Sequence, residues 1–321
     1  MHPIQSEADL DRLRRSMQAY MTISAWASAG LFEALGDGEM RPLSALPGDS
    51  RAISIGATIL GHLGLVQTDG QLWGMSPVGL ELYRSGVLDY IPHEDTCRYL
   101  GGLPEVLRSG TAIQDTDIGV VESDPERVRR FMLSLYRRSE VPSAHVASWV
   151  ARWLPEGGRV LDLGGGHGRY AAEMAKQGME ATLFDKPVCT EIARELCGDG
   201  IAVLNGDFHT DDLGGPYDAI LVSNIVHGLG EGATLALLKR LVAALAPNGR
   251  IVVKDFFAQG SGFQPEGAVL FGLVMLMYTK EGRTYTIAEM QDLLARSGLA
   301  PEQVVEASEL GYELVVGRKL D

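Results

Sequence analysis

The stretch RVLDLGGGHGRY, residues 159–170, decides the fold of most of this chain. A short apolar run with an acid near its end, Asp162, predicts a buried strand. Because glycines lack a side chain, a loop rich in them lets the main chain approach a ligand, with N–H groups at the start of the next helix pointing toward it. Four glycines follow the run within five positions: Gly164, Gly165, Gly166 and Gly168. The stretch therefore predicts a strand, a ligand-binding loop and a helix.

The rhythm of the sequence from about residue 157 to residue 256 predicts a parallel sheet. The strand-like runs are RVLDL, EATLFD, IAVLNGD, DAILVSN and RIVVKDF, and helix-like segments such as GRYAAEMAKQG and ATLALLKRLVAALAPNG lie between them. Such alternation predicts βαβ units, that is, a doubly wound, Rossmann-like α/β sheet with helices on both faces. Ligands of these sheets bind at the carboxyl ends of the strands. We therefore expect the site at that edge.

The residues before this region predict a second, mainly helical domain. Apolar residues recur at helical intervals from about residue 10 to 35, and a further helix is expected from about 51 to 63. LGLVQTDGQLWGMSP then predicts two short strands around the Asp69–Gly70 turn. Helices followed by a hairpin make a winged-helix-like shape. We expect this domain over residues 1–98, and a helical linker with the sheet domain over residues 99–321.

The charges of the winged-helix-like domain argue against nucleic acid as its partner. Residues 21–90 hold three basic and seven acidic side chains, and the whole chain carries a formal net charge of -14. Nucleic-acid affinity comes largely from Lys and Arg that neutralise phosphates. A packing and dimerisation module is therefore the favoured interpretation, with a non-enzymatic regulator that binds ligand or DNA as an open alternative.

Cysteine usage and hydropathy indicate a cytoplasmic protein without membrane insertion. Cys97, Cys189 and Cys197 are unclustered, so neither a disulfide framework nor a metal site is predicted. The first residues lack the apolar segment of a secretory signal. The longest apolar run, residues 268–278, is shorter than the ~20 residues that span a bilayer. A small organic molecule is the expected partner.

Acidic residues follow three successive strands and suit a nucleoside-containing cofactor. Asp185 lies 21 residues after Gly164, where a carboxylate accepts hydrogen bonds from ribose hydroxyls, and NAD would use it equally well. The spacing of the glycines argues against NAD as the cofactor. Dinucleotide enzymes need a third small residue in G-x-G-x-x-G, and that position holds Arg169. The observed spacing is G-x-G-x-G.

The motifs together resemble one family, the class I S-adenosylmethionine-dependent small-molecule O-methyltransferases of the plant-type and bacterial family 2. The similar strings are VLDLGGGHG, FDKP, GDF, SNIVH and APNGRIVV. The resemblance implies S-adenosylmethionine as cofactor and a homodimer formed through the N-terminal domain. It places Asp207 near the adenine amino group and Phe208 beside the base, and Ser223 where many members have Lys. The cofactor-binding residues implied are Asp162, Gly164, Gly165, Gly166, Asp185, Gly206, Asp207, Phe208 and Ser223.

In this family the residue that matches His227 is the general base for a substrate hydroxyl. A phenol has a pKa of ~10 and is a poor nucleophile at neutral pH, whereas a His with a pKa of about 6.5 can take its proton. The family commonly follows its His with Asp or Asn and then Trp, but here Gly228 and Leu229 follow. The hypothesis that Glu231 or a carbonyl orients the ring instead is therefore held open, and Glu281 is a candidate second carboxylate.

The apolar run FQPEGAVLFGLVMLMYTK lies where the family places a helix over the substrate cavity. Met275, Met277 and Tyr278 are candidates to face an aromatic substrate, although we expect most of the run to be core. The expected activity is O-methylation of a hydroxylated aromatic or polyketide-like molecule. Methylation at carbon and a cofactor-retaining decarboxylation stay open, because Gly228 departs from the family pattern.

Overall fold

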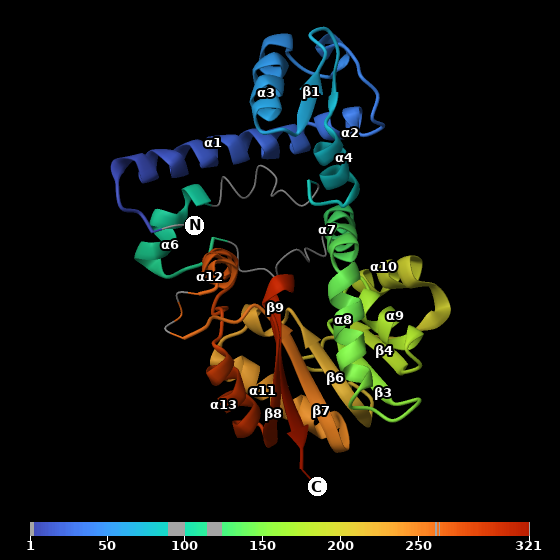
Figure 1. The fold of residues 1–321 in the computed structure, drawn as a ribbon. Coiled ribbons are helices and arrows are strands. Elements are labelled where there is room, and N and C mark those ends of the chain that lie inside the picture. Colours follow the sequence, from blue (N-terminus) through green and yellow to red (C-terminus); the bar gives the residue numbers. More distant parts are fainter. Residues whose placement is uncertain (1–2, 89–99, 114–123, 261, 263, 321) are drawn as a thin grey trace. The chain divides into compact units, whose positions relative to one another are not determined.

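The computed structural model describes residues 3–88, 100–113, 124–260, 262 and 264–320 (Figure 1). The chain divides into two compact units, Met1–Pro104 and Glu105–Asp321. The boundary expected between residues 98 and 99 lies outside the described residues. Within the described residues, no helix is long and apolar enough to cross a membrane.

The N-terminal unit consists of helices followed by a hairpin, as predicted. Side chains before the helices cap them: Ser6 accepts from the Asp9 N–H and Asp49 from the Ala52 N–H. The Asp69 carboxylate closes the hairpin by accepting the Leu72 N–H at 2.8 Å. The elements are α1 (Glu7–Ser28), α2 (Leu31–Leu35), η1 (Leu43–Ala45), α3 (Ser50–His62), β1 (Val66–Thr68), β2 (Trp73–Met75) and α4 (Pro77–Arg84). Their core includes Trp26, Phe32, Leu35, Leu60 and Met75.

The C-terminal unit is built on a seven-stranded sheet in the order β5-β4-β3-β6-β7-β9-β8. The five strands predicted from the sequence pair in parallel, and two C-terminal strands join antiparallel at the β7 edge. The doubly wound α/β sheet is thus confirmed. The strands are β3 (Arg159–Leu163), β4 (Glu180–Asp185), β5 (Ala202–Asn205), β6 (Tyr217–Ser223), β7 (Leu245–Asp255), β8 (Leu299–Ala307) and β9 (Tyr312–Lys319).

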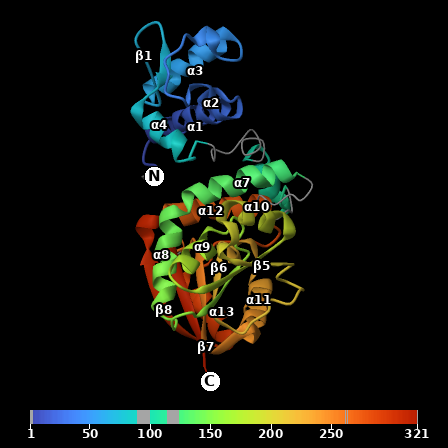
Figure 2. The same ribbon diagram turned by 90° about the vertical axis from the view of Figure 1, so that its right-hand side faces the viewer.

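Helices cover both faces of this sheet because alternate residues of its central strands point to opposite sides. One core joins the sheet to α11 and α13, and the other joins it to α8 and α9 (Figure 2). The helices are α6 (Leu103–Ser109), α7 (Pro125–Arg138), α8 (Glu140–Ala151), α9 (Arg169–Lys176), α10 (Pro187–Cys197), α11 (Glu231–Ala244), α12 (Glu266–Tyr278) and α13 (Ile287–Arg296), with the short turns η2 (Gly198–Gly200), η3 (Val226–Gly228) and η4 (Ser308–Leu310).

The structure differs from the expected elements in two places. Residues 245–249, expected to end a helix, belong to β7, where Leu245 pairs with Tyr217 before an irregularity in the register. Asn248 there adopts a left-handed backbone, with φ of 61°. The strands β8 and β9 were not identified from periodicity, because β9 is buried on both faces and shows no alternation.

Candidate active site

The glycine loop after β3 needs glycine for both conformation and space. The N–H of Gly164 donates to the Phe184 carbonyl at 2.7 Å, and φ of Gly164 is 59°. A Cβ on Gly164 would lie 2.8 Å from Ile225 Cδ1, and one on Gly165 would lie 2.6 Å from Asp162 Oδ2. The loop is therefore packed against the ends of neighbouring strands, with no room for side chains beneath it.

Asp162 lies beneath the glycine loop and is buried. Its Oδ2 accepts the Ala171 N–H at 3.1 Å in the first turn of α9, and its Oδ1 has no hydrogen-bond partner among the described residues. Burial raises the pKa of this carboxyl to about 7. The side chain thus ties the loop to the helix from below, which makes an indirect contribution to a ligand site.

Asp185 stands beside the same loop at the end of β4. Its Oδ2 accepts the Gly166 N–H at 2.8 Å, and its Oδ1 accepts the Lys186 N–H at 2.7 Å. Burial raises the pKa of Asp185. Since the Gly166 N–H is one of the loop donors, the carboxylate and the loop form one surface.

The residues after β5 and β6 reach the same edge of the sheet. The Gly206 N–H donates to the Asp185 carbonyl at 3.1 Å. Asp207 is exposed, and its Oδ1 accepts the His209 N–H at 2.8 Å. Phe208 Cε1 lies 3.8 Å from the position of a Cβ on Gly164. The Ser223 hydroxyl is buried and faces Tyr170 without a well-formed hydrogen bond.

His227, in η3, is held by a carboxylate that the sequence analysis did not identify. Its Nδ1 lies 2.7 Å from Oδ1 of Asp255, the last residue of β7, and its backbone N–H donates to Oδ2 at 3.3 Å. Asp255 Oδ1 also accepts the Phe256 N–H at 2.8 Å. Because a carboxylate accepts, Nδ1 carries the proton and Nε2 is the nitrogen free to accept one. Among the described residues, none is hydrogen-bonded to Nε2.

The hypothesis that Glu231 or a carbonyl orients the His227 ring is wrong. The Glu231 carboxylate forms an ion pair with Arg296 at 2.7 Å and is half exposed. Glu281 is exposed, and its Oε2 would lie 2.5 Å from a Cβ on Gly230, near the His227 loop but not bonded to the ring. Asp255 performs the orienting role, and the signal for it was an acid at the end of RIVVKD, as in the first two strands.

Aromatic rings line one side of His227. The ring of Phe271, in α12, meets it edge-on with centroids 4.7 Å apart, and the Phe256 ring lies 6.4 Å away. In the same helix the substrate-facing candidates Met275 and Met277 are buried, and Tyr278 is partly buried. The expectation that most of this apolar run is core is wrong, because Val269, Leu270 and Val274 are 39%, 45% and 37% exposed. The base candidate therefore stands against an apolar wall suited to a flat ring.

The segment that follows α12 forms hydrogen bonds to the backbone of the His227 loop. The Arg283 N–H donates to the His227 carbonyl at 2.8 Å. The buried Tyr285 hydroxyl donates to the Leu229 carbonyl at 2.8 Å and lies 3.1 Å from Thr234 Oγ1. These bonds leave the loop little freedom to move the imidazole.

Comparison with known proteins identifies the family. Residues 114–300 match the family model of the O-methyltransferase domain. The chain belongs to this O-methyltransferase family. Members of the family use S-adenosylmethionine. Among the described residues, no group of His, Cys, Asp or Glu side chains is arranged to hold a metal ion.

Two curated relatives and one solved structure illustrate the similarity. The acetylserotonin O-methyltransferase of Mus musculus is 29% identical over an alignment of 223 residues that covers 62% of this chain and 56% of the mouse protein. The 3-hydroxy-5-methyl-1-naphthoate 3-O-methyltransferase of Streptomyces sahachiroi is 27% identical over an alignment of 320 residues that covers 92% of this chain and 90% of that enzyme. The structure of human N-acetylserotonin methyltransferase in complex with SAM superimposes with a TM-score of 0.85 over all of both chains, at 20% identity. The last likeness shows the fold.

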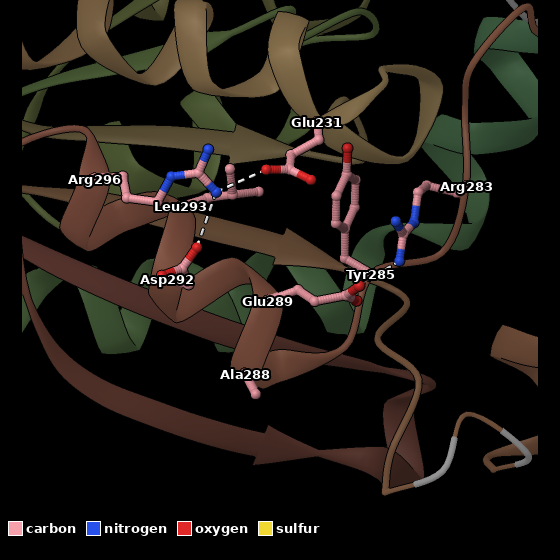
Figure 3. A pocket seen from close by; sticks show the side chains of 8 residues that line it. All are labelled: Glu231, Arg283, Tyr285, Ala288, Glu289, Asp292, Leu293 and Arg296. Atoms are coloured by element: carbon pink, nitrogen blue, oxygen red, sulfur yellow. Dashed lines mark hydrogen bonds and ion pairs between the residues drawn. The ribbon is translucent and has the colours of Figure 1, made fainter.

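One pocket of this O-methyltransferase lies near these elements but not at the strand ends. It has a volume of ≈ 300 Å³ and lies between α11 and α13 (Figure 3). Its charged side chains pair with one another: Arg296 with Glu231 and Asp292, and Arg283 with Glu289. Because these charges are already satisfied, the pocket offers a ligand little, and we assign the chemistry to the strand ends.

Proposed function

We propose that this protein transfers a methyl group from S-adenosylmethionine to a hydroxyl of an aromatic or polyketide-like small molecule. The observation that carries the proposal is the His227–Asp255 pair, with Nδ1 bonded to Oδ1 at 2.7 Å and Nε2 available beside an aromatic wall. The naphthoate O-methyltransferase that aligns with 92% of the chain supports this acceptor class.

The strand ends fit the proposed cofactor. Bound there, S-adenosylmethionine supplies an electrophilic methyl group on a sulfonium. The methionine portion is proposed to lie along the loop of Gly164, Gly165 and Gly166. This loop requires glycine, because Gly164 and Gly166 are left-handed, with φ of 59° and 52°, and a Cβ at Gly164 or Gly165 would lie within 3.0 Å of a neighbouring side chain. Asp185, whose Oδ2 accepts the Gly166 N–H of that loop, is the proposed acceptor for the ribose hydroxyls, and Gly206, Asp207 and Phe208 are proposed for the adenine end. Asp162 supports the loop from beneath, and Ser223 lies at the adjoining end of β6.

His227 is the proposed general base. Its Nε2 takes the proton of the acceptor hydroxyl as the oxygen attacks the methyl carbon, and Asp255 stabilises the imidazolium that forms. The hydrogen bond to Asp255 also orients the His227 ring, although Gly228 replaces the polar residue that commonly follows this His in the family. Among the described residues, no contact in the site favours carbon methylation or decarboxylation over transfer to a hydroxyl.

We propose further that the protein works as a homodimer in the cytoplasm. The helix α1 exposes large apolar side chains that its own unit does not cover, namely Leu10, Leu13, Met17, Tyr20 and Met21. Exposed apolar patches of this kind mark association sites. Cys189 and Cys197 form no disulfide bond within the described residues, which suits a reducing compartment.

The test of the activity combines binding with turnover. Labelled S-adenosylmethionine is incubated with the protein and a metabolite extract of its host, and the compound that gains the label is identified. His227→Gln should lower turnover by about 10²- to 10⁴-fold, the usual share of a general base, and higher pH should partly restore it by ionising the hydroxyl. The affinity for S-adenosylmethionine should change little. Binding of NAD without binding of S-adenosylmethionine in calorimetry would contradict the proposal.

A further inference from the structure

A buried lysine and an exposed asparagine form a pair next to the His227 loop. Lys254 precedes Asp255 in β7 and is 3% exposed, and its Nζ donates to Asn224 Oδ1 at 3.0 Å. Asn224 follows β6 directly, and its backbone N–H donates to the Lys254 carbonyl at 2.9 Å. The Asn224 side chain is exposed. The pair thus runs from the interior to the open end of the sheet.

The lysine decides which way the asparagine amide points. An ammonium has three donors and no acceptor, so only the amide oxygen can face it. The Nδ2 group is then the part of the amide left for a ligand, and among the described residues it has no hydrogen-bond partner. Asn224 therefore presents a donor, not an acceptor, at the carboxyl end of β6.

The surroundings of Lys254 add a positive field behind this donor. No carboxylate among the described residues forms an ion pair with it, and aromatic rings surround it, with Nζ 4.5 Å from the Tyr312 ring centre and 5.8 Å from that of Phe256. Burial in apolar surroundings strengthens the attraction between a cation and an anionic ligand group. A hydrogen bond from the ammonium to Oδ1 also polarises the amide and strengthens its outward donor.

Phe256 links the pair to the proposed base, because its ring lies 5.8 Å from Lys254 Nζ and 6.4 Å from the His227 ring. Asn224 also precedes His227 by only three residues, so both follow the carboxyl end of β6. The backbone also accounts for asparagine here: φ of Asn224 is 58°, a left-handed conformation that Asn tolerates better than most residues.

We propose that Asn224, held by Lys254, is a specificity determinant that binds a second oxygen of the methyl acceptor, a carboxylate or carbonyl carried on the same ring system as the hydroxyl. This inference rests on the proposed function and deepens it by naming the substrate class. The acceptor is then a hydroxylated aromatic acid or ketone and not a simple phenol.

The experiment compares two probes with the same ring and hydroxyl, 3-hydroxy-2-naphthoate and 2-naphthol. Their binding is measured by fluorescence titration with and without S-adenosylhomocysteine (SAH), the demethylated product of the proposed cofactor. The wild-type protein should bind the naphthoate about tenfold or more tightly, the scale of a hydrogen bond to a charged group. Asn224→Gly, which removes the amide yet accepts the left-handed backbone, should abolish the preference. Asn224→Asp should reverse it by placing a carboxylate against a carboxylate, and Lys254→Met should weaken it.

The chain offers a matched control in Asn248, which also has a left-handed backbone, with φ of 61°. Asn248 lies near the N-terminal end of β7, whereas Asn224 lies at the carboxyl ends of the strands. Asn248→Gly should keep the wild-type preference. Equal binding of both probes, binding of neither, or a preference that survives Asn224→Gly overturns the inference. Calorimetry with SAH is read separately: failure to bind SAH contradicts the proposed function, whereas SAH binding without a naphthoate preference contradicts only the role of Asn224.

Discussion

At the scale of single residues, the three contacts that fix Asp255 all come from donors. Its two oxygens accept from His227 Nδ1, the His227 N–H and the Phe256 N–H. An asparagine would have to turn its NH₂ group toward one of these donors. Asp255→Asn should therefore misplace the ring or its proton and lower turnover by about 10²-fold or more, with little effect on cofactor affinity.

Glu231 provides the control for Asp255 because its carboxylate pairs with Arg296 and not with the imidazole. Glu231→Gln should keep turnover within about twofold of wild type, since a surface ion pair contributes ~1 kcal/mol or less to stability. Steady-state kinetics on the identified acceptor measures both variants. Comparable losses in the two would show that the ring is not held by Asp255 in particular.

Lys254 destabilises the fold at neutral pH, and the pH dependence of stability should reveal it. Burial lowers its pKa from 10.5 to about 8, so the folded chain holds this proton more weakly than the unfolded chain. Below pH 8 the penalty is complete, about 3 kcal/mol by linkage. Between pH 8 and 10.5 the folded state loses the proton first and the penalty fades, so this contribution raises stability with pH.

Lys254→Met should then stabilise the protein by on the order of 1–3 kcal/mol at pH 7, and the gain should shrink toward pH 10. Urea denaturation of both proteins at several pH values measures it. Lys239→Met, at an exposed lysine in α11, should show no such pH-dependent difference. A Lys254→Met protein less stable than wild type at pH 7 would contradict the assignment of a costly buried cation. A residue that destabilises the fold is consistent with retention for ligand binding.

At the scale of elements, the loop between β3 and α9 depends on the space that glycine leaves. Gly165→Ala would put a Cβ 2.6 Å from Asp162 Oδ2, and the carboxylate cannot retreat because it is buried and bonded to Ala171. The loop must shift, so the affinity for S-adenosylmethionine should fall about tenfold or more in calorimetry. Gly200→Ala is the control, because a Cβ there meets nothing within 4 Å. Unchanged affinity in Gly165→Ala would separate the loop from the cofactor site.

The elements also show how far the sequence alone could lead. Strand-like apolar runs that alternate with helix-like segments predicted β3 to β7, and the acids that follow these runs predicted the position of the site. Both signals are local, because they depend only on neighbouring residues in the sequence. The pairing of His227 with Asp255 could not be derived in this way. It requires that β6 and β7 be neighbours and that η3 fold back over the end of β7, and both are long-range packing decisions. The strand β9 escaped notice because burial on both faces removes the alternation that marks a strand. The strand β8, which pairs with it at the end of the sheet, has no regular alternation of buried and exposed residues.

At the scale of the whole molecule, the proposed dimer should depend on α1. Met17 is 61% exposed in the middle of this helix, and the other exposed apolar residues of α1 lie around it. Met17→Glu would place a charge in the centre of an apolar interface, where an unpaired charge is costly to bury. We expect the variant to sediment as a monomer at micromolar concentration, while the wild-type protein sediments as a dimer.

Val141 offers a control of equal exposure, also 61%, on α8 in the other unit. Val141→Glu introduces the same charge at an exposed apolar position outside the proposed interface, so it should leave the dimer intact. Stable interfaces bury roughly 1,200–2,000 Å² of surface in total. A single exposed valine cannot supply such an area, whereas a row of large apolar side chains along the 22-residue helix α1 can approach it. A wild-type protein that sediments as a monomer would contradict the proposal that the apolar face of α1 forms a dimer interface. Dissociation by both variants would instead point to a general effect of added negative charge on a chain that already carries -14.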